Sequence, residues 1–238
     1  MTPRCKFLFV LLAFFFLSAC GSPPPPTLVP TIVPPLPTAT SAPPTQPPAP
    51  TQTPSKTGSN QVLLIAKESS YVSERMLTQE VGVMMSMLEK AGFKVVVASP
   101  SGQPITGGTA TLKPDMKLAD VKVEDYAGFI LPCMAIDTAP PEAVEIVRKA
   151  AALGKPIAAQ NSSVVLILAK AGVLTGKQFA MYPGYEIYVP EGIYKGAGVV
   201  QDGNIITSGT CPNYASGTRP DGTAELTQKL IDSLKSVR

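Results

Sequence analysis

Apolar residues beyond position 60 follow two patterns that alternate along the chain. Short apolar runs predict strands that are buried on both faces of a sheet, and these runs lie at 62–66, 128–131 and 157–159, with a fourth at 93–98 that alternates or runs apolar. Apolar residues at helical spacing predict helices, and these segments lie at about 74–90, 140–153, 163–171 and 223–235. Such alternation is typical of an α/β fold that has a mainly parallel sheet with helices on both faces.

Glycine-containing turns add detail to this pattern. Asp202-Gly203 lies between two apolar pairs at 199–200 and 205–206, which predicts a β-hairpin. Gly107-Gly108 lies in a stretch that predicts either a second hairpin or an irregular excursion. Neither turn changes the expected α/β class.

The first 19 residues have the pattern of a bacterial lipoprotein signal peptide. An apolar run of 11 residues at 7–17 follows Arg4 and Lys6 and leads into Leu17-Ser18-Ala19-Cys20. A bilayer core needs about 20 apolar residues, so this run is too short to span it but fits the apolar part of a signal peptide. We expect Cys20 to become the lipid-modified first residue of the mature chain and to anchor it outside the cytoplasm, in the outer membrane if the cell has two membranes. A plain secretory signal with an incidental cysteine is the alternative.

Residues 20–60 are predicted to form a linker. Fourteen of the 26 prolines lie between Pro23 and Pro54, mixed with threonine, serine, alanine and glutamine. Proline lacks a backbone donor and has a fixed φ, so this stretch favours an extended, polyproline-like spacer over helix or sheet. A proline-rich ligand for a partner domain is the alternative. The remaining residues, 61–238, suit a single globular domain.

Composition and charge exclude several classes of function. The chain has no histidine, which excludes Ser-His, Cys-His and His-metal sites, and we predict neither a metal site nor a cofactor. Without residues 1–19 the formal charge falls from +3 to +1. Since the domain has no basic stripe and no motif that reads nucleic acid, we expect no nucleic-acid partner.

Three ordered segments of the domain carry family motifs: YAGFILP at 126–132, a strand, tight turn and helix at 154–177, and GNIITSG at 203–209. Together they resemble the ThiJ/PfpI family, a member of the class I glutamine-amidotransferase-like superfamily, over almost all of residues 62–236. The resemblance implies a flavodoxin-like sandwich, and it also implies a homodimer because members of the family commonly pair.

The resemblance implies a site in which a cysteine at the strand-turn-helix bend lies beside a glutamate. Alignment on Ala91-Gly92 places the glutamate at Glu80, but the bend position is occupied by Asn161, between Gln160 and Ser162. An amide cannot attack a carbonyl. Asparagine does tolerate unusual backbone angles, so we expect Asn161 to preserve the bend without its nucleophile. Ser162 has no histidine to activate it.

The two cysteines of the domain mark further departures from the family pattern. Cys133-Met134 occupy the place of two glycines whose N–H groups form an oxyanion hole in the family, and Cys211 lies in a loop that also borders the family's pocket. Three interpretations stay open: a disulfide between Cys133 and Cys211, a displaced nucleophile or redox thiol at Cys133, or two unpaired and inert thiols.

Two functional hypotheses follow. The first is a membrane-anchored extracytoplasmic ThiJ/PfpI-like domain that lacks cysteine-dependent catalysis and serves as a structural module or binds a small polar ligand. The alternative is a residual hydrolase, amidase or glyoxalase-like enzyme that uses Cys133 with Glu80. In both cases we expect the site to comprise Glu80, Cys133, Met134, Gln160, Asn161, Ser162 and Cys211.

Overall fold

The structure, a computed structural model, describes residues 59–69, 71–134 and 138–237. All of them belong to one compact unit that spans residues 52–238. The expected signal peptide, Cys20 and all but the last two residues of the linker lie outside the described residues. No helix in the described part of the chain combines the length and the apolarity that crossing a membrane requires.

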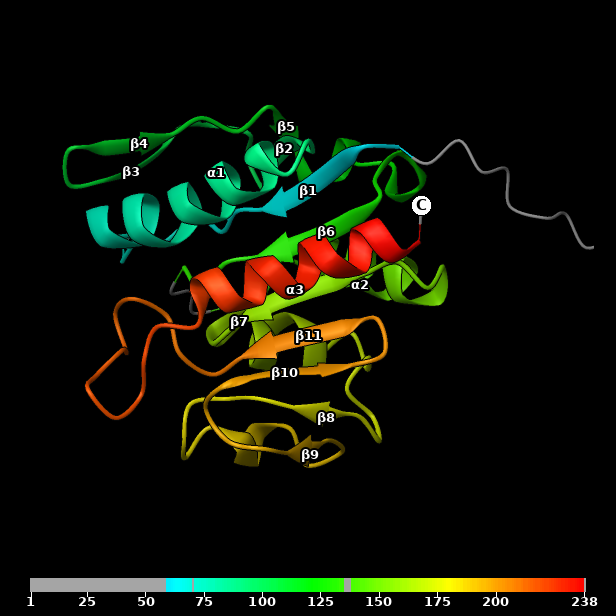
Figure 1. The fold of residues 1–238 in the computed structure, drawn as a ribbon. Coiled ribbons are helices and arrows are strands. Elements are labelled where there is room, and N and C mark those ends of the chain that lie inside the picture. Colours follow the sequence, from blue (N-terminus) through cyan, green and yellow to red (C-terminus); the bar gives the residue numbers. More distant parts are fainter. Residues whose placement is uncertain (1–58, 70, 135–137, 238) are drawn as a thin grey trace, which may run out of the picture. The chain divides into compact units, whose positions relative to one another are not determined.

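A seven-stranded sheet forms the centre of the domain (Figure 1). All its neighbouring strands pair in parallel except β10 and β11, which form an antiparallel hairpin. In spatial order the strands are β10 (Val199–Asp202), β11 (Ile205–Ser208), β7 (Ile157–Gln160), β6 (Gly128–Leu131), β1 (Gln61–Ile65), β2 (Lys94–Ser99) and β5 (Met116–Lys117).

Helices cover both faces of this sheet, and successive strand residues alternate between the two resulting cores. In Figure 1, α1 (Gly82–Lys90) and α3 (Thr223–Ser236) lie in front of the sheet, and α2 (Pro141–Ala152) lies behind it. Leu64 packs into the core with α1 and α3, whereas its neighbour Leu63 packs into the core with α2. This alternation explains the continuous apolar runs, because a strand buried on both faces has no solvent-facing position.

Two helical segments contain a wider, π-helical turn. The segment η1 (Met76–Val81) runs directly into α1, and η4 (Val164–Ala169) follows β7. Single π-helical turns are rare and are frequently found at functional sites. The expected site residue Glu80 lies within η1, and Asn161 lies three residues before η4.

The smaller elements are short and lie outside the main sheet. They comprise the antiparallel pair β3 (Ile105–Gly107) and β4 (Ala110–Leu112), the parallel pair β8 (Gln178–Phe179) and β9 (Ile193–Tyr194), and the 3₁₀ turns η2 (Leu118–Asp120), η3 (Val123–Asp125) and η5 (Glu186–Tyr188). The β3–β4 pair shows that the stretch around Gly107-Gly108 forms a hairpin.

The predicted fold class is confirmed. The four apolar runs form β1, β2, β6 and β7, and the Asp202-Gly203 turn joins β10 to β11. Since β1, β6, β7 and β11 are parallel, their carboxyl ends lie at one edge of the sheet, where the arrowheads point in Figure 1. The segments that leave this edge contain the expected site residues.

Candidate functional site

The bend after β7 holds a carboxamide in a strained backbone conformation. Asn161 has a φ of 44°, one of two positive values among the described non-glycine residues. Its N–H donates to the Ser208 carbonyl at 2.7 Å, and its own carbonyl accepts from the Val164 N–H at 2.9 Å. The chain therefore turns sharply from strand to helix at Asn161, which is one of the few residue types that accept this conformation.

The loop after β6 holds the second strained residue, Met134, which has a φ of 23° and is buried. This loop is fixed to the bend by hydrogen bonds. The Ser163 hydroxyl donates to the Pro132 carbonyl at 2.6 Å, and the Ser162 hydroxyl donates to the Cys133 carbonyl. The two segments that follow β6 and β7 thus form one connected wall of the site.

Lys67, the second residue after β1, is fully buried against this wall. Its ammonium group donates to the Cys133 carbonyl, to Ser162 Oγ at 3.0 Å and to Ser163 Oγ at 2.8 Å. Burial lowers the pKa of Lys67 to about 8, although the nearby Cys133, Glu80 and Cys211 favour its charged form. An ammonium group with three acceptors remains protonated at neutral pH and supplies a fixed positive charge.

Glu80 extends from η1 into the same region and is also fully buried. Its Oε1 accepts a hydrogen bond from the Cys133 backbone N–H at 2.5 Å, and its Oε2 has no hydrogen-bond partner among the described residues. Burial, reinforced by the charge of Cys133, raises the pKa of Glu80 well above its ordinary value. Burial therefore favours the protonated form of this carboxyl group.

Cys133 and Cys211 are buried free thiols that face one another. A hydrogen bond from Cys211 lowers the pKa of Cys133 to about 6, with further help from Lys67 and Ser162. The same contact and burial raise the pKa of Cys211. In this pair the Cys211 thiol donates a hydrogen bond that favours the thiolate form of Cys133. The Cys133–Cys211 disulfide, one of the three interpretations of the sequence, is not formed in this structure.

The Cys211 sulfur also lies beside the bend, because the Asn161 side-chain amide approaches it at 4.0 Å. The loop that carries Cys211 starts at Gly209, where a Cβ would lie 2.4 Å from the backbone of Met181. Only glycine allows so close an approach. The loop is thus held between the bend and the segment around Met181.

The expected oxyanion-hole position is occupied from within the protein. The N–H of Cys133, which stands where the family resemblance implies a glycine, is directed at Glu80 Oε1. Water or a substrate oxygen at that N–H would have to displace the carboxyl group. The loop after β6 therefore stabilises Glu80 instead of offering this donor to a ligand.

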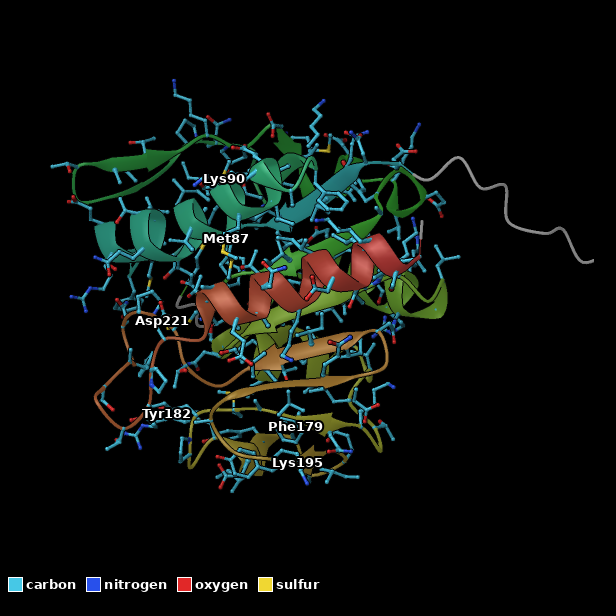
Figure 2. All side chains as sticks on the ribbon, viewed as in Figure 1. Met87, Lys90, Phe179, Tyr182, Lys195 and Asp221 are labelled. Atoms are coloured by element: carbon cyan, nitrogen blue, oxygen red, sulfur yellow. The ribbon has the colours of Figure 1, made fainter. Side chains whose placement is uncertain are left out.

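A cavity of about 350 Å³ lies in front of the bend. Asn161 and Ser162 line it together with aliphatic and aromatic side chains: Val165, Leu166, Met181, Tyr182, Tyr185, Tyr188 and Tyr214. None of these lining residues is charged. Figure 2 shows Tyr182 on the side of the sheet to which the β1 and β6 arrowheads point.

The tyrosines of the cavity form one packed group. The ring of Tyr182 lies 5.3 Å from that of Tyr214 and 6.3 Å from that of Tyr185, which in turn lies 6.1 Å from Tyr188. Arg219 stacks over Tyr182 at 4.9 Å and donates to its hydroxyl at 3.2 Å. Ring-to-ring contact of this kind fixes the orientation of the rings and leaves part of each ring surface free for other contacts.

The seven expected site residues divide into three groups. Asn161 and Ser162 line the cavity. Glu80, Cys133 and Cys211 form a buried cluster in which one oxygen and two sulfurs all lie within 4.8 Å of one another. Met134 packs in the core on the α1 side, and Gln160 donates to the Thr210 carbonyl at 2.6 Å and to Thr223 Oγ1 at 2.9 Å, so it connects β7 to the start of α3.

Sequence reasoning missed two parts of the site. Lys67 is absent from the expected site, although its position directly after a buried strand is a signal for a site residue. The tyrosines at 182, 185 and 188 recur at intervals of three in YPGYEIY. That spacing could have indicated an aromatic surface, but nothing in it locates Tyr214 opposite.

Comparison of sequences identifies relatives over the same region. The sequence profile of the DJ-1/PfpI family matches residues 70–216. An uncharacterised protein from Archaeoglobus fulgidus is 35% identical over 131 residues, which is 51% of this chain and 75% of that protein. One from Methanocaldococcus jannaschii is 29% identical over 143 residues, which is 55% of this chain and 67% of that protein.

Solved structures of ThiJ/PfpI and DJ-1 proteins have a similar backbone. A ThiJ/PfpI domain protein from Brachyspira murdochii has a TM-score of 0.60 at 16% identity, with 75% of this chain and 98% of that one covered. DJ-1beta from Drosophila melanogaster has a TM-score of 0.57 at 25% identity, with 75% and 95% covered. The fold is therefore shared even where few residues are.

Proposed function

The chain belongs to the DJ-1/PfpI family, and on this premise we propose that its domain binds a neutral, ring-bearing small molecule in the cavity in front of the Asn161 bend. We propose further that it has lost the chemistry of a bend cysteine. The single observation that carries both parts is the position of Asn161, which occupies the strained bend and lines the cavity.

The loss of bend chemistry follows from the groups at the bend. The Asn161 carboxamide is not a nucleophile. The neighbouring Ser162 hydroxyl donates a hydrogen bond to the Cys133 carbonyl, and the histidine-free chain has no imidazole to activate it. The Cys133 N–H, which would stabilise an oxyanion, is directed at Glu80. The nucleophile and one oxyanion donor are thus replaced at the same place, and no histidine is present to act as a base.

The ligand class follows from the lining of the cavity. Four tyrosine rings and three aliphatic side chains offer flat, apolar contact area, and the lining residues carry no charge to pair with an ionised ligand. Asn161 supplies both a donor and an acceptor, and Ser162 and the tyrosine hydroxyls add further hydrogen-bonding groups. A neutral ring with one amide or hydroxyl substituent satisfies both kinds of contact.

Benzamide is a suitable probe, with benzoate and benzylamine as charged analogues of the same size. We expect saturation-transfer NMR and calorimetry to detect benzamide binding in the millimolar range, about −4 kcal/mol, and weaker binding of both analogues. Tyr214→Leu should reduce the benzamide affinity, whereas Tyr71→Leu, at an exposed tyrosine that does not line the cavity, should leave it unchanged. Equal losses in both variants, or tighter binding of a charged analogue, would refute the assignment.

Thiol chemistry at Cys133 is the second candidate function. The observation that favours it is the contact with Cys211 and Lys67 that lowers the pKa of Cys133 to about 6, since a thiolate is the reactive form. Its 1% exposure opposes this role. Rapid alkylation of native Cys133 by iodoacetamide, in a chain that carries Cys5→Ser and Cys20→Ser, would favour the thiol enzyme over the binding module. Slow alkylation that requires unfolding would exclude it.

We also propose that the chain is lipid-anchored outside the cytoplasm through Cys20, with residues 21–60 as a spacer. The support is the apolar run that ends in Leu17-Ser18-Ala19-Cys20. Cys20→Ser should move the chain from the membrane fraction to the soluble fraction of expressing cells. Cys5→Ser, a matched change inside the signal segment, should not. Membrane retention of the Cys20→Ser chain would contradict the anchor.

A further inference from the structure

Three side chains of types that can ligate a metal come together from distant parts of the sequence. Glu80 comes from η1, Cys133 from the loop after β6 and Cys211 from the loop after β11. One carboxylate oxygen and the two sulfurs lie within 4.8 Å of one another, and all three side chains are buried. We propose that these three residues form a binding site for Zn²⁺.

The separations suit the coordination sphere of zinc. Zinc–sulfur and zinc–oxygen bonds of about 2.3 and 2.0–2.2 Å place tetrahedral donor atoms roughly 3.5 to 3.8 Å apart. The observed limit of 4.8 Å requires the donors to move inward by at most about 1 Å. Side-chain rotation alone can supply such a shift, since each donor comes from a different segment.

The carboxyl group of Glu80 offers an independent reason for a ligand at this point. Its Oε1 is held by the Cys133 N–H, while its Oε2 is buried and has no partner among the described residues. A buried oxygen without a partner is destabilising by about 1–3 kcal/mol. Coordination of a metal ion satisfies this oxygen, and the hydrogen bond to Oε1 then acts as the outer contact that orients a ligating carboxylate.

The charges around the cluster favour a divalent ion. Two thiolates and one carboxylate carry three negative charges, and the ammonium group of Lys67 is close enough to interact electrostatically with all three residues. Addition of Zn²⁺ makes the buried group neutral, whereas a monovalent ion leaves one uncompensated charge. All three residues ligate zinc in their deprotonated forms, so zinc binding competes with protonation of these groups.

Three protein donors leave the fourth tetrahedral position open. The side-chain amide nitrogen of Asn161 lies 4.0 Å from the Cys211 sulfur. A half-turn of this amide would present its oxygen to the sulfur instead. A water molecule can also fill the position. This inference goes beyond the proposed function, because benzamide binding in the cavity and zinc binding by the three residues are measured separately and either can fail alone.

The test uses the full chain with Cys5→Ser and Cys20→Ser, so that Cys133 and Cys211 are its only thiols. Reduced, anaerobic protein is mixed with zinc sulfate and freed of unbound metal by gel filtration. We expect one zinc per chain by elemental analysis. X-ray absorption at the zinc edge should show two sulfur neighbours at about 2.3 Å and oxygen neighbours at about 2.0–2.2 Å.

Matched variants separate a built site from adventitious metal. Cys133→Ser, Cys211→Ser and Glu80→Gln should each reduce retained zinc to about a tenth or less, while Glu89→Gln, at an exposed position of α1, should retain one equivalent. Less than stoichiometric zinc in the parent chain, retention of copper(I) in its place, or unchanged zinc in Cys211→Ser would overturn the proposal. The absorption spectrum of the parent chain decides the matter even where a variant fails to fold.

Discussion

The middle of the sheet and its carboxyl edge are equally buried but chemically opposite. In the middle, Leu64 of β1, Ile130 of β6 and Ala158 of β7 are fully buried and apolar. At the edge, Lys67 and Glu80 are just as inaccessible to solvent but are polar or charged. Lys67 lies only three residues beyond Leu64 along the chain.

The stability of each region depends on a different physical quantity. A buried apolar side chain contributes through its volume and contact area, so another apolar group of similar size replaces it with little loss. A buried charged or hydrogen-bonding side chain contributes through its partners, and its removal leaves those partners unsatisfied. The edge therefore tolerates fewer substitutions than the middle and holds the groups that can act on a ligand.

The ionisation of Cys133 should show the largest effect. In metal-free protein we expect its thiolate absorbance to appear with a midpoint at about pH 6, an ionisation equilibrium shifted about a thousandfold from that of an ordinary thiol of pKa 9.0. Cys211→Ala should raise the midpoint, because it removes the hydrogen bond that lowers the pKa. A titration midpoint near pH 9 for Cys133 in the parent chain would show that the hydrogen bond from Cys211 does not exist.

The same shift has a consequence for stability. A lowered pKa in the folded state stabilises the native protein above the unfolded value, near pH 9, and this contribution is lost as the pH falls through about 6. The free energy of unfolding of the parent chain, relative to that of Cys133→Ser, should therefore decrease from pH 9 to pH 6. An increase over this range would contradict the thiolate assignment.

Substitution of Lys67 by methionine should have the largest effect on stability at neutral pH. The change conserves length and burial but removes the donor to the Cys133 carbonyl, Ser162 and Ser163, and we expect a loss of about 3 kcal/mol in urea unfolding. Leu64→Met in the middle of the sheet should cost less than about 1.5 kcal/mol.

An exposed lysine of the same sheet serves as the control for that change. Lys94→Met in β2 should alter the free energy of unfolding by no more than about 0.5 kcal/mol. Equal losses at Lys67 and Leu64 would remove the distinction between edge and middle.

The strained bend should show a smaller effect that depends on the substitute. Asn161→Ala places a Cβ-bearing residue without a compensating side chain at a φ of 44° and should cost about 1–2 kcal/mol. Asn161→Gly should cost less, because glycine adopts this conformation freely. Asn213→Ala, at an exposed position without positive φ, is the matched control and should have little effect. A smaller loss for alanine than for glycine would argue against backbone strain at the bend.

Much of the fold could be predicted from the sequence, because strands buried on both faces give continuous apolar runs and helices give their own spacing. The short strands β5, β8 and β9 could not, since two residues are too few to show a period. The bend at Asn161 could be located because it depends on a local strand-turn-helix pattern and on a family resemblance.

The composition of the site was harder to predict. Burial of Lys67 depends on acceptors that come from the loops after β6 and β7. No local sequence pattern shows that these loops lie next to Lys67. We predicted no metal site, because zinc ligands are recognised in sequence by short spacings and by histidine. Glu80, Cys133 and Cys211 are far apart in the chain, and only the parallel order of the strands brings them together.

Binding of a ligand in the cavity can be tested through the side chain of Asn161, which lines it. The chain contains four asparagines, so selective ¹⁵N-asparagine labelling gives a small set of side-chain amide signals, and Asn161→Asp identifies the one from the bend. We predict that benzamide shifts the Asn161 signal in a saturable manner and leaves that of Asn204, in the turn between β10 and β11, unchanged. An unmoved Asn161 signal at benzamide concentrations that saturate the protein by calorimetry would contradict the account.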